Sequence, residues 1–308
     1  MPAIAAFGRY APERRLKNDQ LARILGCEPG WILQASGIEE RRVADEAETV
    51  VDMGAAAGRD CLAKGAGKPA LLIVSSATGD NRFPGPAAEI ALRLGLAGIP
   101  AIDLPVASAG ALFGMATAAA MTGAFGDVLV IAAEKMSIPA RAEPLDRNTA
   151  ILFGDGAGAC LITREGPGLQ IVDAALHSDG TWCGDLRLGL SGPVRMNGLT
   201  VILQAARKLP SAIGEVLQRN GVKADTVGAF LMHQANQNLI DRVARALDVP
   251  PERFYSNIRH YGNTSSASML IAASDWRQTA ALQDGEPVCF AAFGAGFHWG
   301  ALLARQRT

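Results

Sequence analysis

The chain has 308 residues, of which 49% are hydrophobic and 19% are charged, and its net charge is −1. This length and hydrophobic content suffice for one large domain or two fused smaller ones with a sizeable core. A net charge near zero with no long run of one sign argues against nucleic acid as the main ligand, because phosphate binding needs clustered Lys and Arg.

The sequence shows no signal peptide, no membrane-spanning segment and no metal-binding cysteine motif. Residues 1–10 lack the basic, apolar and small-residue zones of a signal peptide, and no apolar run approaches the roughly 18 to 20 residues needed to span a bilayer. The five cysteines are scattered and include no Cys-x-x-Cys pair. We therefore expect a cytoplasmic protein without a membrane anchor or a metal site.

Apolar strand-like runs alternate with helical stretches along the chain, which predicts an α/β fold whose strands are covered on both faces. The segment 109–121 is nearly all small or apolar, so we expect this helix to be buried all round. In chain order, the predicted elements are a helix at 49–64, a strand at 70–74, helices at 86–94 and 109–121, a strand at 128–132, a helix at 201–220, a strand at 227–232, helices at 236–247 and 264–281, with a strand at 288–293 closing the series.

The two halves of the chain show the same pattern at their ends. Strand 127–134 is followed by strand 154–163, and strand 287–293 is followed through a glycine turn by 294–304. This duplication predicts an N-terminal half at 1–166 and a C-terminal half at 167–308, with any shared site at the seam.

Three polar residues stand where a strand gives way to a helix. They are Ser108 in Ala-Ser-Ala-Gly, His233 in His-Gln-Ala-Asn and Asn263 in Gly-Asn-Thr-Ser-Ser. A hydroxyl nucleophile, an imidazole base and an amide donor are the groups that acyl transfer needs. A serine hydroxyl is not ionised near neutrality, so Ser108 needs a base, for which His233 is the candidate. Each residue also has a purely structural alternative: Ser108 could be a helix N-cap, His233 a hydrogen-bonded core histidine, and Asn263 a turn residue.

These residues lie in motifs that resemble the β-ketoacyl-acyl-carrier-protein synthase III branch of the thiolase superfamily. The similarity covers the chain from about Gly8 to Leu303, and its motifs lie at 31–42, 102–110, 146–147, 153–158, 196–198, 233–236, 262–266 and 293–300. The family's catalytic set is Cys, His and Asn, and Ser108 stands at the position of the Cys. The resemblance implies two duplicated α/β halves in a five-layered αβαβα arrangement.

The resemblance also implies roles for further residues. The backbone amides of Ser108 and Ala295 would form an oxyanion hole. Trp31 and Arg147 would sandwich the adenine of CoA, and Asn236 would lie near the pantetheine arm. An acyl pocket would be lined by Phe153, Met196 and Phe293. The alternatives are surface packing for Trp31, an ordinary ion pair for Arg147 and core packing for the three apolar residues.

The function expected from the resemblance is acyl transfer from acyl-CoA onto Ser108, with no other cofactor. The acyl group would pass to a carrier-bound malonyl-type extender by decarboxylative condensation, or to another acceptor, in fatty acid or polyketide-like specialised metabolism. An ester on Ser108 is less reactive toward a carbanion than a thioester, so condensation becomes harder. Two alternatives stay open: a catalytically silent partner subunit of a ketosynthase heterodimer, and an engineered Cys-to-Ser variant. A serine hydrolase is disfavoured because the Gly-x-Ser-x-Gly motif is absent.

Partners also follow from the resemblance. It implies a homodimer, because residues 83–86 match a loop that reaches the partner's pocket, and an acyl carrier protein as the second substrate. Leu203 and Asn238 occupy positions where carrier-docking Lys and Arg are typical, which weakens the usual docking patch. An alternative basic patch would consist of Arg195, Arg207, Lys208 and Arg242.

Overall fold

The computed structural model describes residues 1–308, and ten of its strands form one continuous mixed sheet. The strand order is β12-β11-β13-β14-β8-β1-β7-β6-β4-β5. The bounds of these strands are β1 Ala3–Tyr10, β4 Leu71–Ser75, β5 Ala101–Leu104, β6 Val128–Lys135, β7 Asp155–Thr163, β8 Gly168–Ser178, β11 Ala229–Met232, β12 Phe254–Tyr255, β13 Pro287–Gly294 and β14 His298–Arg307.

The sheet repeats the same pattern on either side of the β8–β1 pair. In the first half β4 pairs in parallel with β5 and β6, and β7 and β1 follow in antiparallel fashion. In the second half β11 pairs in parallel with β12 and β13, and β14 and β8 follow in the same way. We propose the division near residue 166 on this repeat, since that residue lies in the turn between β7 and β8.

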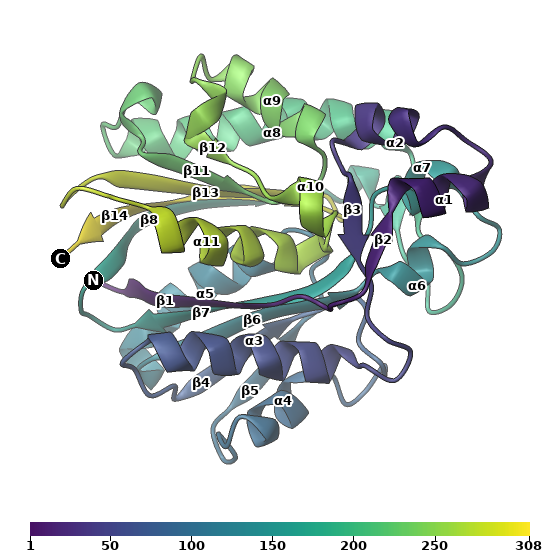
Figure 1. Ribbon diagram of the computed structural model, residues 1–308. Helices are drawn as coiled ribbons and strands as arrows, with labels where there is room; N and C mark the ends of the chain where they lie inside the picture. The colour runs from purple at the N-terminus through teal and green to yellow at the C-terminus, as the bar shows by residue number, and fades with distance from the viewer.

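Helices separate and cover the two halves of the sheet, which gives the five layers visible in Figure 1. The central layer consists of α5 (Gly110–Phe125) and α11 (Ser268–Thr279), and a core of 29 buried residues surrounds these two helices. One outer layer consists of α3 (Val50–Lys64) and α4 (Ala87–Arg93), and the other of α8 (Gly198–Arg219) and α9 (Gln237–Ala246). The expected αβαβα arrangement is confirmed.

The short elements gather at one end of the layers, on the right in Figure 1. Strands β4, β6, β11 and β13 all run toward this end, so the residues that follow β5, β11 and β13 meet there. These short elements are β2 Arg15–Lys17, α1 Asn18–Leu25, α2 Pro29–Ser36, β3 Glu40–Arg42, α6 Ser137–Ala140, α7 Arg147–Ala150, η1 Gly180–Trp182, β9 Leu186–Arg187, β10 Arg195–Met196, α10 Ile258–Tyr261 and η4 Ser265–Ala267. Two further turns, η2 Ala224–Thr226 and η3 Pro251–Arg253, precede β11 and β12 at the opposite end.

The predicted strands and helices are all present, with shifted ends. Helix α8 begins earlier than predicted because the Asn197 side chain accepts a hydrogen bond from the Thr200 amide and caps it. Helix α11 begins later, because residues 263–267 form a turn that carries part of the site. None of the helices is both long enough and apolar enough to cross a membrane.

The expectation that the helix at 109–121 is buried all round is wrong. One face of α5 packs between the two halves of the sheet, but Thr117 and Ala120 within this segment are exposed. The sequence pattern did not reveal this because small and apolar residues occupy both faces of the helix.

Candidate active site

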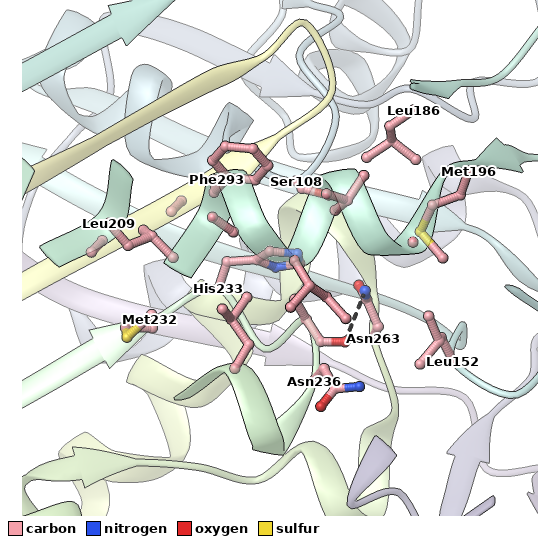
Figure 2. Close-up of a pocket in the computed structure, with 18 of the residues that line it drawn as sticks. Ser108, Leu152, Leu186, Met196, Leu209, Met232, His233, Asn236, Asn263 and Phe293 are labelled. Carbon is pink, nitrogen blue, oxygen red and sulfur yellow. Dashed lines mark hydrogen bonds between the residues drawn. The ribbon is translucent and has the colours of Figure 1, made fainter. Parts of the chain in front are cut away.

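A cavity of about 80 Å³ lies at the seam between the two halves and brings the predicted catalytic residues together. Ser108, His233 and Asn263 all line it (Figure 2). The three residues are more than 90% buried, so polar groups act here in a low-dielectric environment. Fourteen of the nineteen lining residues are hydrophobic, which suits an acyl chain.

Ser108 sits on a strained turn between β5 and α5. Its φ of 61° lies in the left-handed region, which non-glycine residues rarely adopt and which costs of order 1–3 kcal/mol. The residue precedes the N-terminus of α5, whose partial positive charge stabilises negative charge on an attacking oxygen. A Cβ at Gly110 would overlap Ser75 Oγ, and one at Gly294 would overlap the Ala107 carbonyl, so only glycine permits this close packing around the turn.

His233 directly follows β11 and is held by Ser268 rather than by Ser108. Its Nδ1 lies 2.6 Å from Ser268 Oγ, and no hydrogen bond joins the ring to Ser108. Burial lowers the pKa of His233 from 6.5 to about 4, against a weaker opposing effect of the Ser265 backbone carbonyl. The ring is therefore neutral across the physiological pH range.

Asn263 has its amide orientation fixed by the backbone. Its Oδ1 accepts a hydrogen bond from the Ser265 amide at 2.9 Å, and its Nδ2 donates to the Ala235 carbonyl at 3.3 Å. The Asn263 main chain is also bonded to the first half, through the Leu152 carbonyl at 2.9 Å and the Gly154 amide at 3.0 Å. Nδ2 keeps its second hydrogen for a ligand in the cavity.

Sequence reasoning missed Glu134, a fully buried carboxyl group at the end of β6. Its Oε1 accepts hydrogen bonds from Ser265 Oγ at 3.0 Å and Ser266 Oγ at 2.7 Å, and its Oε2 accepts from the Ala77 amide and Thr78 Oγ. Burial raises the pKa of Glu134, and these four hydrogen bonds oppose the rise. An acidic residue ending a continuous apolar strand, followed far along the chain by a serine cluster, was the available signal.

The two amides expected to form an oxyanion hole differ in the structure. The Ala295 amide makes no hydrogen bond and is free to donate. The Ser108 amide already donates to Ser265 Oγ at 3.1 Å, so this half of the predicted hole is occupied. A ligand oxygen would have to replace Ser265 Oγ as the acceptor, because one amide hydrogen makes one strong bond.

Trp31 and Arg147, predicted to sandwich adenine, lie next to each other. The Arg147 guanidinium lies 5.3 Å from the centre of the Trp31 ring. An intervening base needs two stacking contacts, roughly 7 Å in all, so the two side chains would have to separate for adenine to enter, and the sandwich stays a prediction. Asn236 lines the cavity but caps α9: its Oδ1 accepts from the Asn238 amide and its Nδ2 donates to the Ala35 carbonyl.

The residues predicted for the acyl pocket line the cavity, and one residue of the predicted basic patch is engaged elsewhere. Phe153, Met196 and Phe293 all face it. Lys208 lies 3.4 Å from Asp179 and over the Trp299 ring, which removes it from the basic patch considered for carrier docking. None of the five cysteines lines the cavity, and no group of three His, Cys, Asp or Glu side chains is placed to hold a metal ion.

Models of known protein families match two parts of the chain. Residues 102–180 match the 3-oxoacyl-[acyl-carrier-protein] synthase III family, and residues 217–306 match the C-terminal domain of the same enzymes. The first region contains Ser108, and the second contains His233, Asn263 and Ala295.

Comparison with individual proteins extends the similarity to nearly the whole chain. β-Ketoacyl-[acyl-carrier-protein] synthases III of Oleidesulfovibrio alaskensis and Geobacillus kaustophilus are 37% and 36% identical to it, over 98% of both chains in each case. The crystal structure of 3-oxoacyl-[acyl-carrier-protein] synthase III from Aquifex aeolicus matches with a TM-score of 0.94 at 34% identity, covering 99% of this chain and 100% of the other. The priming β-ketosynthase of the R1128 polyketide pathway matches with a TM-score of 0.91 at 30% identity, covering 99% of this chain and 96% of the other.

The lowered pKa of His233 predicts a pH-dependent stability. Between pH 6.5 and 4 the unfolded chain binds a proton on this residue that the folded chain does not, so the free energy of unfolding falls as the pH falls. From pH 7 to pH 4.5, urea unfolding of the wild type should show a loss about 2 to 3 kcal/mol larger than that of His233→Asn. Equal losses in the two proteins would mean that the buried imidazole titrates normally.

Proposed function

This chain belongs to the 3-oxoacyl-[acyl-carrier-protein] synthase III family and is an acyltransferase. We propose that it takes an acyl group from acyl-CoA onto Ser108 and passes this group to a carrier-bound malonyl-type extender or to another acceptor. One observation carries this proposal: Ser108, His233 and Asn263 line a single apolar cavity at the seam of the two halves. No further cofactor enters the reaction that we propose.

Acyl loading uses the position of Ser108 before α5. Its Oγ attacks the thioester carbon, a C–O bond forms as the C–S bond breaks, and the hydroxyl proton ends on the departing CoA thiolate. The helix N-terminus and the free Ala295 amide stabilise negative charge during this attack. Phe153, Met196 and Phe293 then surround the acyl chain.

Carbon–carbon bond formation, if the acceptor is a malonyl-type extender, uses His233 and Asn263. The extender loses CO₂, and the electron pair moves onto its thioester carbonyl oxygen to give an enolate that hydrogen bonds to these two side chains stabilise. The enolate carbon attacks the ester carbon, the acyl C–O bond to Ser108 breaks, and the released serine alkoxide takes up a proton from solvent. An ester carbonyl is a weaker electrophile than a thioester, so an oxygen, nitrogen or sulfur nucleophile is the competing class of acceptor. The corresponding pathways are fatty acid synthesis and polyketide-like specialised metabolism.

The carrier protein would approach over α8, beside the mouth of the cavity. Gly198, Val201 and Ile202 of this helix line the cavity, while Leu199 and Leu203 on its outer face are 72% and 51% exposed. With Lys208 occupied by Asp179, we propose that exposed arginines flank an apolar contact on this surface. Those arginines are Arg195, Arg207 and Arg242.

A catalytically silent partner subunit is the second candidate function. The observation that favours it is that Ser108 has no hydrogen-bonded base, whereas a cysteine at this position would be partly ionised without one. The well-ordered donors Asn263 and His233 argue against it, because a silent subunit has no need of a fixed ligand geometry.

Acyl loading can be measured by intact-protein mass spectrometry after incubation with a panel of acyl-CoAs. We expect the wild type to gain one acyl group, mapped to Ser108, and Ser108→Ala to gain none. Ser108→Cys should load faster, on the order of tenfold or more, because a thiolate is a stronger nucleophile than a hydroxyl.

Loading of Ser108→Cys alone would instead support the silent subunit, or a serine introduced in place of a native cysteine. Absence of an adduct on both proteins with every donor would refute the acyl-loading proposal.

We propose a homodimer because three apolar features of the molecule are exposed. Strand β5 is the edge of the ten-stranded sheet and exposes 40% of Ile102, and the apolar helix α5 exposes Phe125. The loop at 82–86 exposes 86% of Phe83, which is far more than a large aromatic side chain normally shows in a monomer. A second copy of the chain would bury all three features and place Phe83 near the partner's cavity.

The oligomeric state can be measured by light scattering. We expect twice the mass of the chain for the wild type, and a shift toward the monomer for Ile102→Lys, because a charge on the edge strand opposes sheet pairing. Ile24→Lys, at a site on α1 that is 62% exposed, is the matched control and should stay dimeric. A monomeric wild type at micromolar concentration would contradict the proposal.

A further inference from the structure

Ser268, the first residue of α11, lies behind His233 and away from the acyl cavity. Its side chain is only 2% exposed, and its Oγ has two hydrogen-bond partners. The Gln234 amide lies 3.0 Å from Oγ, and Nδ1 of His233 lies 2.6 Å from it. No other contact of Ser268 Oγ reaches hydrogen-bond distance.

These two contacts determine which group carries the hydrogen. The Gln234 amide can only donate, so it occupies one lone pair of Ser268 Oγ. The hydroxyl hydrogen then has one acceptor within hydrogen-bond distance, Nδ1 of His233; the Ser265 carbonyl, which raises the pKa of the ring, forms no hydrogen bond with Ser268 Oγ. If Nδ1 carried the hydrogen instead, the buried hydroxyl would have no acceptor, which costs about 1–3 kcal/mol.

We propose that Ser268 is a positioning residue that donates its hydroxyl hydrogen to Nδ1 of His233 and so holds the neutral ring as the Nε2–H tautomer. His233 then presents a hydrogen-bond donor at Nε2. The lowered pKa of the imidazole supports a neutral ring, but the assignment of the tautomer depends on the two contacts of Ser268.

The tautomer defines what His233 does in the reaction, and this step of the argument rests on the proposed function. An Nε2–H group and the Asn263 Nδ2–H group are two donors, which matches a developing enolate or thioester oxygen. A ring that already carries its hydrogen on Nε2 cannot take the proton of Ser108 there. The tautomer therefore does not support the sequence-based expectation of His233 as the base for Ser108, and it agrees with the donor role already proposed for His233 and Asn263.

The tautomer can be read directly by two-bond ¹H–¹⁵N correlation spectra of the ¹⁵N-labelled protein at pH 7. His233 is assigned by the signal that disappears in His233→Asn. We expect the Nε2–H pattern in the wild type, and an Nδ1–H pattern there would overturn the proposal without any variant. This readout does not depend on acyl chemistry, so it can succeed even where the proposed function fails.

Three variants test whether Ser268 imposes the tautomer. Ser268→Ala should shift the ring toward a mixture of tautomers and lower kcat of the condensation on the order of tenfold, because a misplaced donor weakens transition-state binding. Ser268→Thr keeps the hydroxyl and should restore the Nε2–H pattern. The matched control is Ser274→Ala on the same helix, whose buried hydroxyl has no partner and whose loss should leave the ring unchanged. An unchanged Nε2–H spectrum in Ser268→Ala would refute the role of Ser268.

Discussion

A buried carboxyl group, Glu134, is the interaction on which the geometry of the site depends. It joins the first half of the chain, through Ala77 and Thr78, to the start of the central helix of the second half, through Ser265 and Ser266. Ser265 passes this restraint on, because its Oγ accepts the Ser108 amide and its own amide donates to Asn263 Oδ1. One carboxyl group thereby holds the nucleophile turn and a substrate donor in register.

The duplicated fold explains why this restraint works. Parallel strands from both halves end at the same side of the molecule, so turns that are more than 100 residues apart in sequence meet at the seam. Ser108 and Ser265 both adopt a positive φ there, which surrounding contacts must hold in place. The backbone bonds of Asn263 to Leu152 and Gly154 add such contacts from the first half. The site is pre-organised before a ligand enters.

Much of the fold and the identity of the polar residues could be predicted from the sequence. Apolar runs and helical patterns gave the α/β class, the family resemblance gave the five layers, and strand exits gave Ser108, His233 and Asn263. The pairing of side chains could not be predicted, because it depends on contacts between distant segments: Ser265 occupies the Ser108 amide, Arg147 closes onto Trp31, and Ser268 holds His233. Isolated serines between strand and helix read as ordinary caps in sequence, and only their packing against Glu134 or His233 distinguishes them.

The most direct test of whether Glu134 holds the nucleophile turn through Ser265 compares Ser265→Ala with Ser266→Ala. Each substitution removes one hydroxyl donor to Glu134 Oε1, so both should lower the free energy of unfolding by about 1–3 kcal/mol. Only Ser265 also contacts Ser108. We expect the loss of its hold on the nucleophile turn to outweigh the release of the Ser108 amide, so the rate of acyl-adduct formation should fall on the order of tenfold in Ser265→Ala and stay within about twofold in Ser266→Ala. Equal loading rates in the two variants would contradict the claim that Glu134 holds the nucleophile through Ser265.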